Sequence, residues 1–274
     1  MILNIPSHSA KSGGELLAKG LVRKIMMLTI DQHKSIGWGL IIACLMISLW
    51  VMSFAGLLML NVQEMAFAWI ALGVLLRTFL STGLFITAHD AMHGSVFPGN
   101  PKVNHGIGAI ALMLYALLPY KMLLKKHHLH HRFPTGDRDP DFCEGQNQNF
   151  FAWYFHFMRG YWSWARFFGL LAIGGVLYGV LQVSPINLLL FWLLPLGFSS
   201  FQLFFFGTFL PHREPAGGYE APYYSQSFPL PVILSFLTCY HFGYHQEHHQ
   251  YPQVPWWQLP KIYQQIVQQT ATAE

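Results

Sequence analysis

The chain has 274 residues, of which 53% are hydrophobic and only 10% are charged. A soluble domain carries about 25% charged residues, so this chain lacks the polar surface that a soluble protein of its length needs. The apolar content excludes a disordered chain, and three well-separated cysteines exclude a disulfide-built secreted module. An integral membrane protein remains, with a net charge of +4 and an unexpected 15 histidines.

Four apolar stretches predict membrane-spanning helices, each of which needs roughly 20 residues. They pair into two hairpins, the second joined at Ser184 and Pro185, where proline ends a helix. Pro195 predicts a kink in the last span. The predicted spans are residues 37–60, 66–88, 167–183 and 186–210. The fold class is therefore an all-α integral membrane protein of four transmembrane helices.

Three other apolar segments favour a position at the membrane surface. Residues 106–120 and 228–240 are too short to span and predict re-entrant or interfacial helices. Residues 149–168 are rich in aromatic side chains and predict a helix in the membrane interface, either as a simple aromatic belt or as a route for a lipid-soluble substrate. One polar stripe of this helix would consist of His156, Arg159, Ser163 and Arg166.

The basic residues orient the chain in the membrane. Of the 16 Lys and Arg residues, 15 lie in residues 1–36, 89–166 and 211–274. The positive-inside rule makes these three segments, and with them both termini, cytoplasmic. The remaining basic residue is Arg77, inside the second span, which is expected to be functional, to pair with Glu64 or to snorkel. The whole chain, 1–274, is expected to be a single domain.

Three dense histidine clusters carry the chemistry. They lie at 89–93, 127–131 and 245–249, each on the predicted cytoplasmic side. Residues three and four apart share one face of a helix, so eight imidazoles can converge there. A zinc ion takes four ligands or fewer, so eight imidazoles imply two metals, or one metal with redundant ligands. The eight are His89, His93, His127, His130, His131, His245, His248 and His249.

Further histidines and carboxylates lie close to these clusters. His212 follows the fourth span and is expected to be a ninth ligand, whereas His241 and His128 are expected to be ligands or outer partners. His8, His33, His105 and His156 lack partners in the pattern and are expected to be solvated. Carboxylates often orient ligating imidazoles, although capping and turn formation explain such residues equally well. The candidates are Asp90, Asp137, Asp139, Asp141 and Glu247.

At these clusters the sequence resembles the membrane fatty-acid-desaturase/hydroxylase superfamily. Its pattern is a pair of histidines three or four residues apart, followed by two boxes of the form His-x-x-His-His. Within the superfamily the chain is most similar to bacterial-type beta-carotene ketolases over roughly residues 35–262. The segments that carry this resemblance are 85–94, 137–142, 150–154, 208–213, 240–249 and 254–260.

The resemblance implies a non-haem site with two iron ions that activates molecular oxygen. It implies oxidation of C4 on the beta-ionone ring, in which two hydroxylations and loss of water convert beta-carotene into echinenone and canthaxanthin. The boxes do not encode acceptance of 3-hydroxylated rings, as in the conversion of zeaxanthin to astaxanthin. No dinucleotide fingerprint or iron–sulfur cysteine cluster is found, so an external donor such as reduced ferredoxin is expected.

The predicted partners are therefore carotenoids, oxygen, the electron donor and the lipid bilayer, with no nucleic acid. Basic residues on the cytoplasmic side could attract an acidic electron carrier, although positive-inside topology also explains them. They are Lys121, Lys125, Lys126 and Arg132. Alternatives of the same chemistry are a carotenoid ring hydroxylase and an acyl-lipid desaturase. An alternative of another class is a metal transporter or sensor, although transport predicts ionisable ligands inside the spans.

Overall fold

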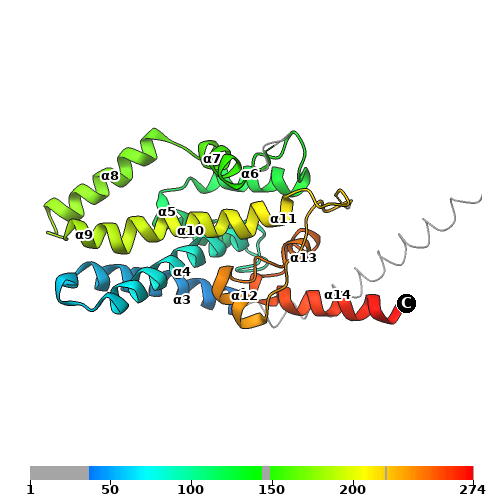
Figure 1. The fold of residues 1–274 in the computed structure, drawn as a ribbon, viewed down its shortest axis with the longest axis horizontal. Coiled ribbons are helices and arrows are strands. Elements are labelled where there is room, and N and C mark those ends of the chain that lie inside the picture. The colour runs from blue at the N-terminus through cyan, green and yellow to red at the C-terminus, as the bar shows by residue number, and fades with distance from the viewer. Residues whose placement is uncertain (1–36, 144–148, 220, 274) are drawn as a thin grey trace, which may run out of the picture.

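The computed structural model describes residues 37–143, 149–219 and 221–273, and every regular element within these ranges is helical (Figure 1). Three helical segments are long and apolar enough to cross a membrane: Trp38–Leu58, Phe67–Met92 and Pro185–His212. Many large apolar side chains on these helices are exposed, among them Trp38 and Phe67. Such apolar helices indicate a membrane protein.

The first hairpin has nearly the predicted bounds. Helix α3 (Trp38–Leu58) and helix α4 (Phe67–Met92) are joined by a short helical turn, η1 (Val62–Glu64). Helix α4 continues four residues beyond the predicted end at Ala88. As a result His89 lies within the last turn of α4, and His93 caps its C-terminus.

Arg77 is buried in this hairpin, but it does not pair with Glu64 or reach the membrane surface. Its guanidinium donates to the main-chain oxygens of Trp50 and Phe191, at 2.8 and 3.0 Å, and lies 4.4 Å from the ring of Trp50. Glu64 instead accepts a hydrogen bond from Asn61. Arg77 therefore fastens α4 to α3 and to the last long helix, because buried guanidinium donors must find acceptors.

The last long segment contains the predicted irregularity. Two wide turns with π-helical geometry interrupt it, and the first ends just before Pro195, whose ring has no N–H to donate. Helix α11 brings His212 to the end of the segment. The successive parts are α9 (Pro185–Leu188), η2 (Leu189–Leu193), α10 (Leu194–Phe204), η3 (Phe205–Phe209) and α11 (Leu210–His212).

The predicted span 167–183 differs from the structure. Helix α8 covers Trp164–Gly179, which is 16 residues and too short to count with the three long helices. At 1.5 Å per residue it is about 24 Å long, against an apolar bilayer thickness of about 30 Å. Its far end lies at the same end of the molecule as the turn between α3 and α4 (Figure 1).

The aromatic segment 149–168 forms two helices rather than one. Helix α7 spans Phe150–Gly160, and α8 begins after a break in which the Ser163 hydroxyl accepts a hydrogen bond from the Arg166 amide. The predicted polar stripe is therefore interrupted. Serine favours the N-cap position because its side chain satisfies a free amide of the first helical turn.

A group of short elements at the other end of the bundle forms a cap (Figure 1). Helices α5 (Pro101–Ala116) and α6 (Tyr120–Arg132) meet at an angle of 104°, as in a broken span or re-entrant loop. This geometry is compatible with the re-entrant segment predicted at 106–120. The cap is made up of α6 together with the C-terminal elements α12 (Val232–Cys239), α13 (His245–Gln250), η4 (Trp256–Gln258) and α14 (Leu259–Ala273).

Candidate metal centre

Four helix ends bring nine histidines together at the cap end of the bundle. They come from the end of α4, from α6, from α11 and from α13, which lie near one another in Figure 1. The ring nitrogens form two groups, and within each group all of the candidate ligand atoms lie within 4.8 Å of one another. The first group is His89, His93, His127, His131 and His248, and the second group is His130, His212, His245 and His249.

In the first group the Nε2 atoms point at one another. His93 and His127 approach to 2.6 Å, His131 and His248 to 2.9 Å, and His89 and His248 to 3.1 Å. The second group is similar: Nε2 of His245 lies 3.0 Å from that of His212 and 3.1 Å from that of His249. His130 completes it, with its ring centre 4.6 Å from that of His212.

The two groups divide the second and third boxes between them. His130 turns to the second group while its neighbour His131 turns to the first, because adjacent helical residues point about 100° apart. In α13, His248 joins the first group and His245 and His249 join the second. The rings of His131 and His249 stack at 4.3 Å, so the groups share a boundary.

In several rings, the contacts of the second nitrogen, Nδ1, determine which tautomer the imidazole adopts. Nδ1 of His130 lies 2.9 Å from the carboxylate of Asp139, and Nδ1 of His212 lies 3.0 Å from the main-chain oxygen of Tyr224. An oxygen of this kind only accepts, so the Nδ1 atom carries the hydrogen and Nε2 keeps its lone pair. Asp90 lies 3.4 Å from Nδ1 of His89 and also accepts from the Trp256 amide.

Burial keeps the rings of α13 neutral. Loss of solvent, reinforced by the neighbouring imidazoles, holds the pKa of His245, His248 and His249 well below the usual histidine value. A neutral imidazole is the form that binds a metal. Nδ1 of His245 is buried and accepts or donates no hydrogen bond among the described residues.

These donors fit two metal ions. Nitrogens that bind one ion at about 2.1 Å lie about 3 Å apart at neighbouring coordination positions, which matches the Nε2 separations in both groups. A cation between facing lone pairs also removes their mutual repulsion. Imidazole ligands suit iron, copper, nickel and zinc, so the donor set indicates metal binding without choosing the element.

Other predicted residues lie outside the two groups. His241 contacts the Ser235 hydroxyl at 3.1 Å, and His128 approaches the main-chain oxygen of Met92 at 3.4 Å. Glu247 accepts a hydrogen bond from Ser227, and Asp137 is exposed. The predicted role of these four residues beside a metal therefore has no support in the geometry.

The four isolated histidines have different outcomes. His105 is exposed, as predicted, and its Nδ1 also lies 3.1 Å from the Tyr120 hydroxyl, because the bend between α5 and α6 brings the two together. His156 is exposed, as predicted. His8 and His33 lie outside the described residues.

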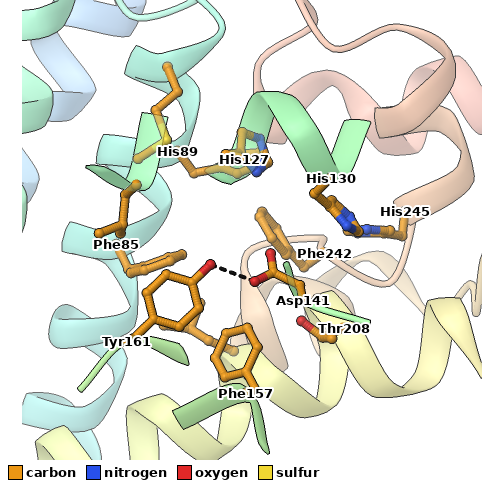
Figure 2. A pocket seen from close by; sticks show the side chains of 14 residues that line it. Phe85, His89, His127, His130, Asp141, Phe157, Tyr161, Thr208, Phe242 and His245 are labelled. Atoms are coloured by element: carbon orange, nitrogen blue, oxygen red, sulfur yellow. Dashed lines mark hydrogen bonds between the residues drawn. The ribbon is translucent and has the colours of Figure 1, made fainter. Parts of the chain in front are cut away.

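Two cavities lead from the histidines into the bundle, and Figure 2 shows the inner one. The inner cavity, about 70 Å³, is lined by His89, His127, His130 and His245 together with Asp141 and several aromatic residues. The outer cavity, about 330 Å³, continues between α5, α7, α8 and α10. The residues that line both are Phe85, Leu123, Phe157, Tyr161 and Leu203.

The sequence pattern gave no indication of Tyr161, which lies where the cavities meet and donates a 2.5 Å hydrogen bond to Asp141. The break between α7 and α8 directs this side chain inward. A Gly160-x-x-Ser163 pattern, which combines a helix stop with an N-cap residue, is the signal that could have revealed the break.

Comparisons with known proteins show which family the chain is similar to. The family model "Fatty acid desaturase" matches residues 65–173 and 160–273. A beta-carotene ketolase of Paracoccus sp. (strain PC1) is 44% identical over 67% of this chain and 75% of its own length. Beta-carotene 4-ketolase 3 of Haematococcus lacustris is 44% identical over 66% of this chain and 58% of its own length. A beta-carotene 4-ketolase of Protosiphon botryoides is 37% identical over 92% of this chain and 68% of its own length.

Proposed function

Because the chain belongs to the fatty acid desaturase family, we propose that it is an oxygen-dependent ketolase of carotenoid beta-ionone rings. The substrate would be beta-carotene or a related carotenoid, and the products echinenone and canthaxanthin. Relatives that are named beta-carotene ketolases support this class of substrate. The whole chain would act as one domain.

The shape of the two cavities is the observation that supports the proposal most directly. The lining of the two cavities follows one face of the last long helix, at Leu193, Leu196, Gly197, Ser200, Leu203, Gly207 and Thr208. Fifteen residues at 1.5 Å per residue make a path about 22 Å long. Such a narrow, largely apolar path that ends at histidines suits an elongated hydrocarbon with a reactive ring at its tip.

The chemistry requires two oxidations of one carbon. In each, a C–H bond of the ring becomes C–OH while O₂ takes up two electrons and two protons, so that one water is released. After the second oxidation the carbon carries two hydroxyl groups and loses water to give the ketone. The electrons would come from an external carrier such as reduced ferredoxin.

The nine histidines would hold two iron ions, the first group one ion and the second group the other. Bound iron would supply the activation of oxygen. Asp139, through His130, and the main-chain oxygen of Tyr224, through His212, hold their rings with Nε2 turned inward. Phe85, Phe157 and Phe242 line the inner cavity and exclude water from the reacting ring.

The position in the membrane forms part of the proposal. We infer four crossings, with the bilayer locally thin around α8, which is the ordinary response to a short apolar helix. The cap with its histidines and both termini would face the cytoplasm. Lys121, Lys125 and Arg132 are exposed there and available to an acidic electron carrier, whereas Lys126 is tied to the main-chain oxygen of Gly160 at 2.6 Å.

Expression in cells that make beta-carotene, followed by chromatography of the pigments, tests the proposal. The parent chain should yield echinenone and canthaxanthin. Hydroxylated carotenoids alone would indicate a ring hydroxylase, and unchanged pigment with altered fatty acids would indicate a desaturase. Purified protein that contained zinc alone and consumed no oxygen would favour a transporter or sensor.

Box variants extend the same experiment. His127→Ala, His131→Ala and His248→Ala each remove an imidazole from the first group, so ketone formation should fall at least a hundredfold while the protein still inserts in the membrane. His156→Ala, on the exposed side of α7, is the matched control and should retain parental activity. Full activity in any box variant would contradict the assignment of that ligand.

A further inference from the structure

We propose that the Tyr161 hydroxyl, paired with the carboxylate of Asp141, binds the oxygen of the once-hydroxylated ring and retains that ring for its second oxidation. This inference rests on the proposed ketolase function. It assigns a positioning role toward the substrate to Tyr161 and Asp141, although Asp141 also lies within 4.8 Å of a ligand atom of His130 and of Asp139.

The pair lies where the substrate would stop. Tyr161 lines both cavities, and Asp141 lines the inner one beside His130. Figure 2 shows their hydrogen bond between the row of histidines and the ring of Phe157. A ring that entered along the outer cavity would therefore meet this pair as it reached the histidines.

The pair is held rigidly and has spare hydrogen-bonding capacity. Tyr161 donates to one oxygen of Asp141, and the other oxygen of that carboxylate has no hydrogen-bond partner among the described residues. The Lys126 ammonium lies 4.1 Å from the centre of the Tyr161 ring, and the Trp153 indole donates to the main-chain oxygen of Asp141 at 2.8 Å. A substrate hydroxyl can donate to the open carboxylate oxygen or to the phenol oxygen.

The ring needs a hydrogen-bond partner only after the first of its two oxidations. The initial ring is a hydrocarbon, and the apolar walls suffice to hold it. After one hydroxylation the ring carries an alcohol, which is unfavourable in an apolar cavity unless it is hydrogen-bonded. Without a partner the alcohol would leave for the bilayer surface, and with one it stays for the second oxidation. The pair would thus decide whether the enzyme releases an alcohol or a ketone.

The Tyr161→Phe variant tests this role because it removes only the hydroxyl. In the pigment assay, the ratio of 4-hydroxylated to 4-keto products should rise about fivefold, the change that the loss of one hydrogen bond typically makes. Tyr154→Phe is the matched control: it also removes a cavity hydroxyl, but one bonded to Ser200 at 2.6 Å in the outer cavity alone. Its product ratio should equal that of the parent, whatever its total yield.

A binding measurement without turnover separates substrate retention from a structural effect. Quenching of tryptophan fluorescence in metal-free protein in detergent would report the affinities for beta-carotene and for its 4-hydroxylated form. The parent should prefer the alcohol, and Tyr161→Phe should reduce that preference about fivefold with the affinity for beta-carotene unchanged. Metal content, measured on separately loaded protein, should match the parent.

Three results would overturn the inference. They are an unchanged product ratio, an unchanged preference for the alcohol, and loss of bound metal from Tyr161→Phe, which would make the pair a support of the metal site. A parent chain that makes neither alcohol nor ketone would instead refute the proposed ketolase function, and the binding preference would still test the pair.

Discussion

His212 and His241 are both buried histidines near the centre, yet their surroundings differ. His212 faces His245 through Nε2 and is held from behind by the main-chain oxygen of Tyr224. His241 contacts Ser235 and packs beside the ring of Trp256. Of the two, only His212 turns its Nε2 atom toward the Nε2 atom of another histidine, as most rings of the two groups do.

Metal content should distinguish these two residues. His212→Ala removes one of the four rings of the second group, so the purified protein should retain one metal ion per chain where the parent should hold two. His241→Ala should retain both ions. Elemental analysis of protein purified in detergent gives the ratio, and equal losses in the two variants would refute the choice of His212.

The box histidines could be predicted because their spacing is local to one helix. The i, i+3 and i+4 pattern indicated which rings share a face, and the end of the last span indicated His212. The division into two groups could not be predicted, because it depends on how α6 and α13 lie against each other. His130 and His131 are neighbours in the chain but belong to different groups.

At the scale of helices, the angle between α5 and α6 positions the second box. Gly108 of α5 packs against the ring of Tyr120, the first residue of α6, so closely that a Cβ atom at position 108 would overlap it. His105 also contacts the Tyr120 hydroxyl. The missing side chain of Gly108 thus permits the bend that directs His127, His130 and His131 toward the other histidines.

A valine at this position should displace α6. Gly108→Val forces the Tyr120 ring away, so we expect a loss of roughly 1–3 kcal/mol of stability, the usual cost of overpacking, together with reduced metal content. Gly106→Val makes the same change in the same helix, where a Cβ atom meets no neighbour within 4 Å. Thermal unfolding in detergent and elemental analysis should separate the two variants. Equal effects would show that helix propensity, rather than the contact with Tyr120, is responsible.

Helix boundaries followed from sequence where a strong local signal exists, as at Ser184 and Pro185. The break between α7 and α8 was missed because the aromatic run continues through it without a change in hydropathy. The partners of Arg77 could not be predicted either, because two of its acceptors are the main-chain oxygens of Trp50 and Phe191, which tertiary packing brings near, and the third is the Ser53 hydroxyl. Sequence carries no pattern for a main-chain acceptor.

For the molecule as a whole, the short turns of both hairpins lie at one end and the histidine cap at the other (Figure 1). The turn residues 61–65 and 180–184 contain no Lys or Arg, whereas the cap is basic. By the positive-inside rule, this asymmetry predicts that the histidine cap lies on the cytoplasmic side. An electron carrier could then reach the cap through water while the substrate enters from the bilayer.

Cysteine labelling in intact cells tests that orientation. In a background where Cys44, Cys143 and Cys239 are replaced, Gln63→Cys and Gln182→Cys place exposed thiols in the two turns, and Lys261→Cys places one on α14. A membrane-impermeant maleimide should label positions 63 and 182 from outside. Position 261 should react only after the cells are permeabilised, because the positive-inside rule predicts a cytoplasmic cap. Labelling of position 261 in intact cells would reverse the orientation. Protection of position 182 there, with labelling after permeabilisation, would mean that α8 does not cross.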